Sequence, residues 1–219
     1  MDTKKLFLAT TVGLAMSAAY VAEVPATAQT TTFSDVPTTN SHYKGITELA
    51  KSGIVTGVSA TKFEPYKNAT RGEAALFLAN ALKLDTKNVK NPNFKDVPTS
   101  SPYYGAIAAL QAKGIIGGYS DGTFKPAASL TRSQFAKMLT LGFELDLAPV
   151  KNSAFIDVNS IKDAATKQYI LTLVEYSITT GTTPTTFSPT TPLKRGQVAT
   201  FLYKSMAAVA DEFKVISVE

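Results

Sequence analysis

The sequence predicts a mostly α-helical domain of three helix–loop–helix repeats around a pseudo-threefold axis, with at most short strands. A four-residue motif, Phe-x-Asp-Val, carries this prediction because it returns twice at a spacing of 61 residues. An arginine recurs later in each unit, at spacings of 61 and 63. Helices this short cannot bury an apolar face alone, so we expect the three units to share one core. The motifs begin at Phe33, Phe94 and Phe155, and the arginines are Arg71, Arg132 and Arg195.

Residues 1–28 have the pattern of an export signal. Lys4 and Lys5 precede an apolar stretch, residues 6–21, and Ala26-Thr27-Ala28 forms an A-x-A cleavage site. The alternative is a retained membrane anchor, but the apolar stretch is shorter than the ~20 residues that a spanning helix needs. We therefore predict a secreted protein, with no membrane span after the signal is removed.

The remaining chain divides into three units at 29–93, 94–154 and 155–210, followed by residues 211–219. The last residues alternate like a strand from Phe213 to Val218, so they are read as a tail or as the start of a following domain. Signal removal takes away two lysines and two acids, which leaves the net charge near +5. This modest, dispersed excess weakly favours an anionic partner and does not indicate nucleic-acid binding.

The first helix of each unit is predicted from apolar residues at helical spacing, over about 42–52 in unit one. Gly53 and Gly114 follow the last periodic residue of units one and two, where a left-handed position favours glycine. Unit three has Ser177 at that place, so its helix should end less well.

A loop with a recurring glycine follows the first helix. We expect a positive φ at these glycines, although a close approach of the backbone to a ligand is the alternative. The loop leads to a Phe-x-Pro motif, whose phenylalanine belongs to the predicted core, as does that of Phe-x-Asp-Val. The glycines are Gly57, Gly118 and Gly181.

The second helix begins with a capping box in two units, where a threonine hydroxyl and a Glu or Gln side chain satisfy each other's backbone N–H. These pairs are Thr70 with Glu73 and Thr131 with Gln134. Unit three has Lys194-Arg195-Gly196-Gln197 instead, so a helix that starts earlier, at Thr191-Pro192, is the alternative there. We interpret Glu73, Gln134 and Gln197 as caps in preference to ligands.

The arginine stands at the first helical position, beside the positive end of the helix dipole. A cation there costs a few tenths to ~1 kcal/mol, so its repetition indicates a site. Unpaired backbone N–H groups and a guanidinium together could receive a carboxylate or phosphate. The alternative is an ion pair with the repeated aspartate of a neighbouring unit, Asp35, Asp96 or Asp157.

Little in the composition suggests catalysis or a metal site. The chain has one histidine, His42, and no cysteine, so a histidine triad or zinc cluster has almost nothing to build on. Residue counts leave a glycosidase-like carboxylate pair open, but the repeated aspartates recur with the fold as structural residues do. We predict no enzyme activity and no cofactor. Four tyrosines could line a sugar site or belong to the core: Tyr43, Tyr103, Tyr104 and Tyr119.

Four motifs in the same order, three times, resemble the S-layer homology domain over essentially the whole chain after the signal. The motifs are F-x-D-V, a glycine-bearing loop, F-x-P and T-R-x-[EQ]. The resemblance implies a three-pronged helical domain that anchors exported proteins non-covalently to secondary cell-wall polysaccharide of Gram-positive bacteria, through a pyruvate ketal on the terminal sugar. Arg71 and Arg132 match the family's arginine. Arg195 sits in an altered motif, where Lys194 could supply a charge.

The leading hypothesis is thus an anchor located in the cell wall, at the cell surface, that binds pyruvylated polysaccharide through these arginines and the loop glycines. The first alternative is a segment of a lattice-forming S-layer protein, which adds self-assembly to anchoring. The second, less favoured, is a wall hydrolase.

Overall fold

The computed structural model describes residues 32–216, and side chains as far as Ala210. The predicted export signal, residues 1–28, lies outside the described residues. Within them the chain forms seven helices and no strand. The helices are α1 (Tyr43–Lys51), α2 (Arg71–Ala81), α3 (Tyr104–Ala112), α4 (Arg132–Gly142), α5 (Ile156–Asn159), α6 (Ala164–Glu175) and α7 (Arg195–Ile216). The mostly α-helical fold class with helix–loop–helix repeats is therefore confirmed.

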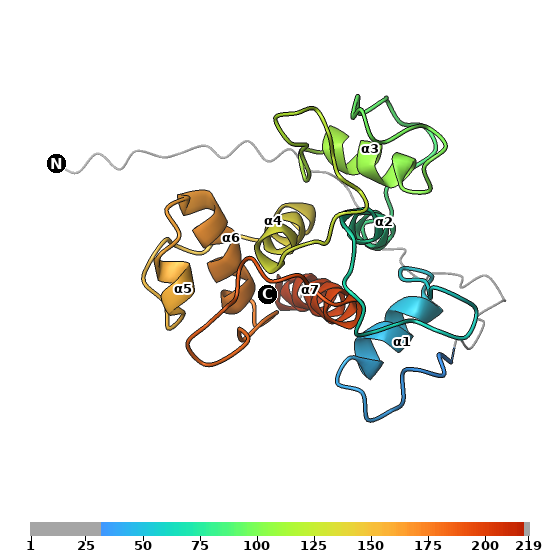
Figure 1. Ribbon diagram of the computed structural model, residues 1–219. Helices are drawn as coiled ribbons and strands as arrows, with labels where there is room; N and C mark the ends of the chain where they lie inside the picture. Colours follow the sequence, from blue (N-terminus) through green and yellow to red (C-terminus); the bar gives the residue numbers. More distant parts are fainter. Residues whose placement is uncertain (1–31, 217–219) are drawn as a thin grey trace.

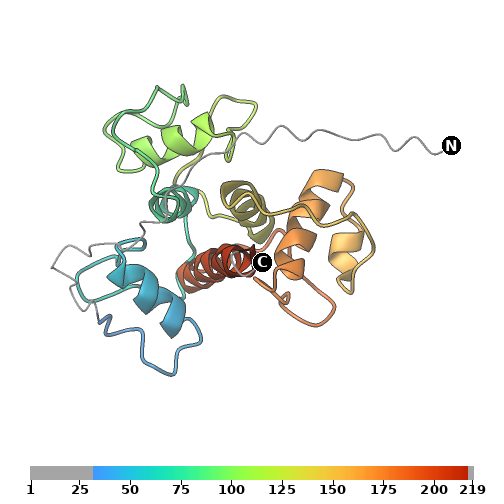
Figure 2. The same ribbon diagram turned by 180° about the vertical axis from the view of Figure 1, so that it is seen from behind.

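The second helices of the three units, α2, α4 and α7, pack together at the centre of the molecule, and α1, α3 and α6 surround them (Figures 1 and 2). Each second helix packs mainly against the first helix of the following unit. α2 contacts α3, α4 contacts α6, and α7 returns to α1. The repeats therefore form a closed ring, in which every prong is built from two successive units.

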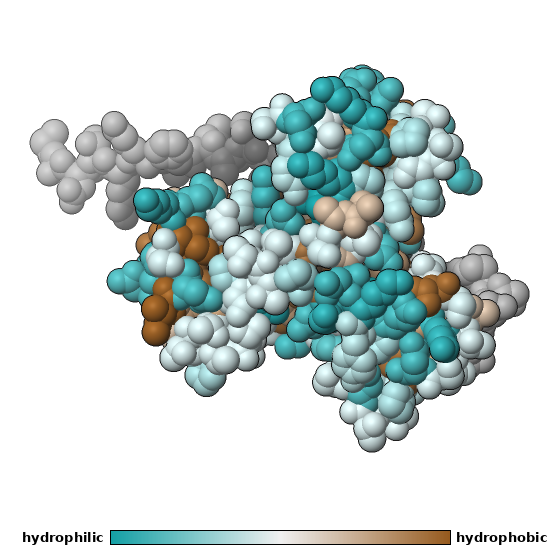
Figure 3. Space-filling model, viewed as in Figure 1, coloured by the Kyte–Doolittle hydropathy of each residue, from teal (hydrophilic) through white to brown (hydrophobic). Residues whose placement is uncertain are grey.

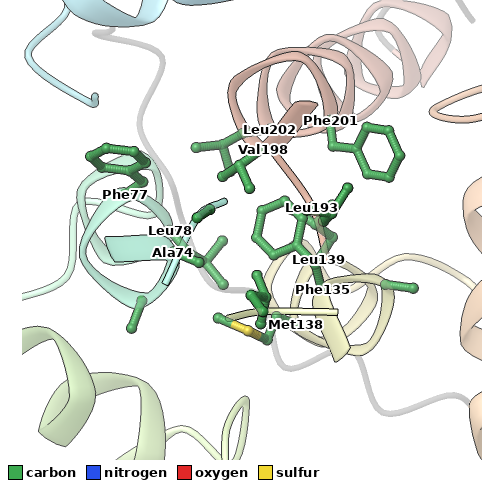
Figure 4. Close-up of a cluster of buried hydrophobic side chains, with 14 of the residues drawn as sticks. Ala74, Phe77, Leu78, Phe135, Met138, Leu139, Leu193, Val198, Phe201 and Leu202 are labelled. Atoms are coloured by element: carbon green, nitrogen blue, oxygen red, sulfur yellow. The ribbon is translucent and has the colours of Figure 1, made fainter. Parts of the chain in front are cut away.

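The core lies between the three central helices (Figure 4). Leu78, Leu139 and Leu202, which the repeat places at equivalent positions, have no exposed surface. Phe135 lies beside them. Burial of one such side chain stabilises the fold by ~1.5–3 kcal/mol, and only the assembled ring supplies the partners. A single unit therefore has no complete core of its own.

Both predicted capping boxes are present. The Thr70 hydroxyl accepts from the Glu73 N–H at 3.2 Å, and the Glu73 carboxylate accepts from the Thr70 N–H at 2.8 Å. Thr131 and Gln134 repeat the arrangement at 3.3 and 3.1 Å. In unit three, Gln197 still accepts from the Lys194 N–H, at 2.9 Å. All three Glu or Gln side chains are thus caps, as predicted.

The alternative start of the last helix at Thr191-Pro192 is wrong, because α7 begins at Arg195. The preceding residues are held extended by unit two. The Thr191 carbonyl accepts from the Arg132 N–H at 3.1 Å, and the Leu193 N–H donates to the Leu130 carbonyl at 2.9 Å. These bonds between units take the backbone groups that an earlier helical turn would need.

The ends of the first helices follow the prediction. Gly53 and Gly114 have φ values of 68° and 72°. Ser177 adopts the same left-handed conformation at 55°, although it carries a Cβ. Such a residue costs ~1–2 kcal/mol relative to ordinary backbone, so the α6 terminus is the strained one of the three.

The strand predicted from Phe213 to Val218 is wrong as far as the structure describes it, because α7 continues to Ile216. No glycine or proline follows Gly196, so nothing in the sequence stops the helix. A strand also needs a partner, and the described residues offer only isolated bridges. Residues 217–219 lie outside the described residues.

The surface is mostly hydrophilic on the face in Figure 3, with separate apolar patches on the prong of α5 and α6. α5 is a single turn that begins within the third Phe-x-Asp-Val motif, and the sequence did not predict this turn. Its Ile156 is 69% exposed. None of the helices described is long and apolar enough to span a bilayer.

Candidate functional site

The repeated aspartates hold the Phe-x-Pro loops of their own units. Asp35 accepts from the N–H groups of Phe63 and Glu64, at 2.9 and 2.7 Å. The middle residue of each loop is left-handed, with φ near 60° at Glu64, Lys125 and Ser188. A carboxylate that receives two backbone N–H groups stabilises this turn. Equivalent bonds run from Phe124 and Lys125 to Asp96, and from Phe187 and Ser188 to Asp157.

Each arginine reaches over the Phe-x-Pro loop of the following unit. The Nε of Arg71 donates to the Phe124 carbonyl at 2.9 Å, and its guanidinium carbon lies 4.5 Å from the centre of the Phe124 ring. We call this contact a corner and name it by its arginine. The Arg132 corner uses Phe187 and the Arg195 corner uses Phe63, with nearly the same distances. The arginines therefore fasten successive units together.

The expectation of open backbone N–H groups at these helix starts is wrong. The N–H of Arg71 donates to the Ala128 carbonyl and that of Gly72 to the Pro126 carbonyl, both at 2.9 Å. The capping box takes the N–H groups of Thr70 and Glu73. All four groups at the start of α2 are occupied because the next unit docks there. An anion at a corner therefore cannot use the N–H groups of the helix start.

The alternative of an arginine–aspartate ion pair is also not found, because no such pair joins the described residues. Arg195 pairs with Glu73 instead. Arg195 also donates to the Phe63 carbonyl at 2.8 Å and to the Thr56 carbonyl at 2.8 Å, and only 2% of it is exposed. Its charge is neutralised by a neighbouring side chain, and each of its nitrogens has a partner.

Arg132 is equally buried but has a neutral partner. Its Nη2 donates to the Thr179 hydroxyl at 3.3 Å, and its guanidinium lies between the rings of Phe187 and Phe201, at 4.5 and 5.3 Å. Burial lowers the pKa of Arg132, and the charge of Asp157 opposes this effect. The guanidinium stays protonated at neutral pH because the ordinary pKa of an arginine lies far above neutrality.

Arg71 differs from both, because its terminal nitrogens donate to no described residue. It borders an open pocket of about 190 Å³, which we call the Arg71 groove. The other walls are the loop 115–119 and three residues of α4: Gln134, Lys137 and Met138. Pockets for drug-sized ligands measure roughly 300–1,000 Å³. The Arg71 groove therefore has room for the terminal chemical group of a ligand, but not for a whole drug-sized molecule.

The Arg71 groove is cationic. Burial lowers the pKa of Arg71, and Tyr119 and Asp96 oppose this effect, so the guanidinium remains charged. Lys137 adds a second cation, and no carboxylate lines the pocket. Lys137 was not among the site residues predicted from the sequence. Its position three residues after Gln134 on the same helix was the available signal.

Tyr119 is the one of the four candidate tyrosines that lines this pocket. Its ring lies 5.1 Å from the Arg71 guanidinium carbon and is 38% exposed. The other three pack partly buried against the core, which is one of the two roles that the sequence offered for them. An aromatic face beside a cation suits a sugar that carries an acid group.

The recurring loop glycines are needed mainly for space. Gly181 has the predicted positive φ, 85°, but Gly57 and Gly118 do not, so the expectation is wrong for them. A Cβ at Gly118 would lie 2.3 Å from the Phe94 ring, and one at Gly57 would lie 2.6 Å from the Phe33 ring. The phenylalanine of Phe-x-Asp-Val therefore requires a glycine against it. Lys194, the proposed extra cation, donates to the Asn68 side chain at 2.7 Å.

The profile of the S-layer homology domain matches the chain three times, at residues 32–75, 93–136 and 154–199, which together make more than half of its length. The chain is 32% identical over 218 residues to the surface-layer 125 kDa protein of Lysinibacillus sphaericus, covering 97% of this chain and 18% of that protein.

Two further relatives have other descriptions. An endoglucanase of Bacillus sp. (strain KSM-635) is 32% identical over 185 residues, which cover 78% of this chain and 19% of the enzyme. A cellulosome-anchoring protein of Acetivibrio thermocellus is 32% identical over 149 residues, which cover 66% of this chain and 33% of that protein. The chain thus spans a third or less of each of these relatives. It belongs to the S-layer homology domain family, which confirms the predicted family and the predicted location at the cell surface.

Proposed function

We propose that this chain anchors a protein to the bacterial cell wall by binding pyruvylated secondary cell-wall polysaccharide. The observation that carries the proposal is the Arg71 groove, where a nine-tenths buried arginine borders an open pocket and its terminal nitrogens donate to no described residue. A pyruvate ketal presents one carboxylate on a sugar ring. That carboxylate matches the planar guanidinium, and Tyr119 offers an aromatic surface to the ring.

The relatives support anchoring as the shared role of the matched segment. One is described as an anchoring protein, others as surface-layer proteins, and one as an enzyme. Proteins of such different description share a segment that corresponds to this chain, which favours a common attachment module. Self-assembly into an S-layer is the second candidate, favoured by the surface-layer relatives. Electron microscopy of purified protein, searched for two-dimensional arrays, tests it.

Calorimetric titration of the protein with purified pyruvylated wall polysaccharide tests the main proposal. A charge-assisted bond contributes ~1.5–3 kcal/mol, so we expect Arg71→Ala to weaken binding about tenfold to a hundredfold. Arg71 also fastens α2 to Phe124, so the fold of this variant must be checked by thermal unfolding.

Lys137→Ala provides a second variant that leaves the corner intact, because Lys137 is exposed on α4. We expect it to weaken binding about twofold to fivefold, as suits an exposed charge. Unchanged affinity in both folded variants would overturn the assignment of the binding site. Equal affinity for polysaccharide stripped of pyruvate would overturn the ligand.

A further inference from the structure

The three corners share one backbone frame, but one of them carries Glu and the other two carry Gln at the third position of the second helix. Glu73 occupies this position at the Arg195 corner, Gln134 at the Arg71 groove and Gln197 at the Arg132 corner. The cap itself does not distinguish them, because each side chain accepts the N–H of its own N-cap residue. The difference is the second carboxylate oxygen of Glu73, which accepts a hydrogen bond from Arg195 and gives this corner a negative charge.

We propose that the three corners are unequal receptors, and that Glu73 closes the Arg195 corner by acting as a built-in carboxylate. This inference rests on the proposed function. Glu73 already pairs with the guanidinium that a ligand carboxylate would need. A second carboxylate would have to displace Glu73 and would be repelled by its charge.

The Arg71 groove lacks such an occupant. Gln134 is neutral, and its amide nitrogen is directed to the Tyr119 hydroxyl, at 3.4 Å. Unit two also has Gly117 where unit one has Thr56, and a Cβ at Gly117 would meet no atom within 4 Å. The loop therefore leaves room in front of Arg71, whereas the carbonyl of Thr56 accepts from Arg195.

The Arg132 corner ranks between these two. Its guanidinium is as buried as that of Arg195, but its terminal partner is the neutral hydroxyl of Thr179, at 3.3 Å. A carboxylate can replace a hydroxyl without charge repulsion. The expected order of affinity is thus the Arg71 groove, then the Arg132 corner, with the Arg195 corner closed.

The chain provides matched substitutions for the test. Glu73→Gln gives the Arg195 corner the residue that units two and three already use with the same cap, so the helix start is preserved. Gln134→Glu makes the reverse change at the Arg71 groove. Thermal unfolding verifies that both variants fold.

Amide NMR spectra of the folded protein can report on each of the three corners separately during a titration. The probe is a methyl hexopyranoside that carries a cyclic pyruvate ketal, and the reporters are the equivalent amides of Gly57, Gly118 and Gly181. In the unaltered protein we expect Gly118 to shift first and Gly181 at higher concentration, with Gly57 unmoved. Glu73→Gln should make Gly57 respond, and Gln134→Glu should weaken the response of Gly118 at least tenfold.

Two failures are distinguishable. The inequality of the corners is refuted if the amides of Gly57 and Gly118 shift with the same midpoint. It is also refuted if folded Glu73→Gln leaves the Gly57 amide unresponsive while the Gly118 amide still shifts. If no loop amide responds, or if the hexoside without the ketal gives the same shifts, the proposed function itself is refuted.

Discussion

Replacement of Asp96 by asparagine tests whether the repeated aspartates hold the loops that the arginines grip. The Asp96 carboxylate accepts from Phe124 and Lys125 N–H groups, both at 2.8 Å. Asparagine has one acceptor oxygen, so one N–H loses its partner and the other bond loses its charge. Hydrogen bonds to a charged group contribute ~1.5–3 kcal/mol each, and the one neutral bond that remains contributes ~0.5–1.5 kcal/mol. We therefore expect a loss of ~3 kcal/mol in the free energy of unfolding.

For a folded domain of this size, 1 kcal/mol corresponds to about 2–4 °C in melting temperature. Asp96→Asn should therefore melt about 6–12 °C below the unaltered protein, measured by circular dichroism and by urea unfolding. Asp146→Asn is the matched control, because Asp146 is exposed and its carboxylate bonds to no described residue. A difference of less than about 0.5 kcal/mol between the two variants would refute the reasoning.

Two further predictions concern stability. Ser177→Gly should stabilise the protein by ~0.5–1 kcal/mol because it removes the Cβ from a left-handed residue, whereas Gly114→Ser should destabilise it. If both variants unfold at the same urea concentration as the unaltered protein, this prediction is wrong. Burial lowers the pKa of His42 below its ordinary value of 6.5, so just below pH 6.5 the unfolded chain binds more protons and stability falls as the pH drops. His42→Gln should reduce that slope in unfolding titrations between pH 7.5 and 5.5, and identical slopes would rule it out.

Much of the local structure could be predicted because it depends on short-range chemistry. The capping boxes of Thr70 and Thr131 and the left-handed Gly53 and Gly114 follow from residues within one helical turn. The repeat itself predicted that the three units share one core, where Leu78 and its equivalents are now seen to be buried. Such features need no knowledge of what lies across the molecule.

The composition of each corner could not be predicted, because it depends on how the ring closes. Arg195 and Glu73 are 122 residues apart, and they meet only because α7 packs against unit one. The helix starts looked unpaired in the sequence for the same reason, since their N–H groups are taken by carbonyls of the next unit. The glycine at Gly118 was misjudged because its constraint is the Phe94 ring, not its own backbone angle.

The most direct test of the central claim is a sedimentation assay of the protein with native cell walls and with walls from which pyruvate has been removed chemically. We expect most of the protein to sediment with native walls and little to sediment with the stripped ones. Equal binding to both kinds of wall would contradict it.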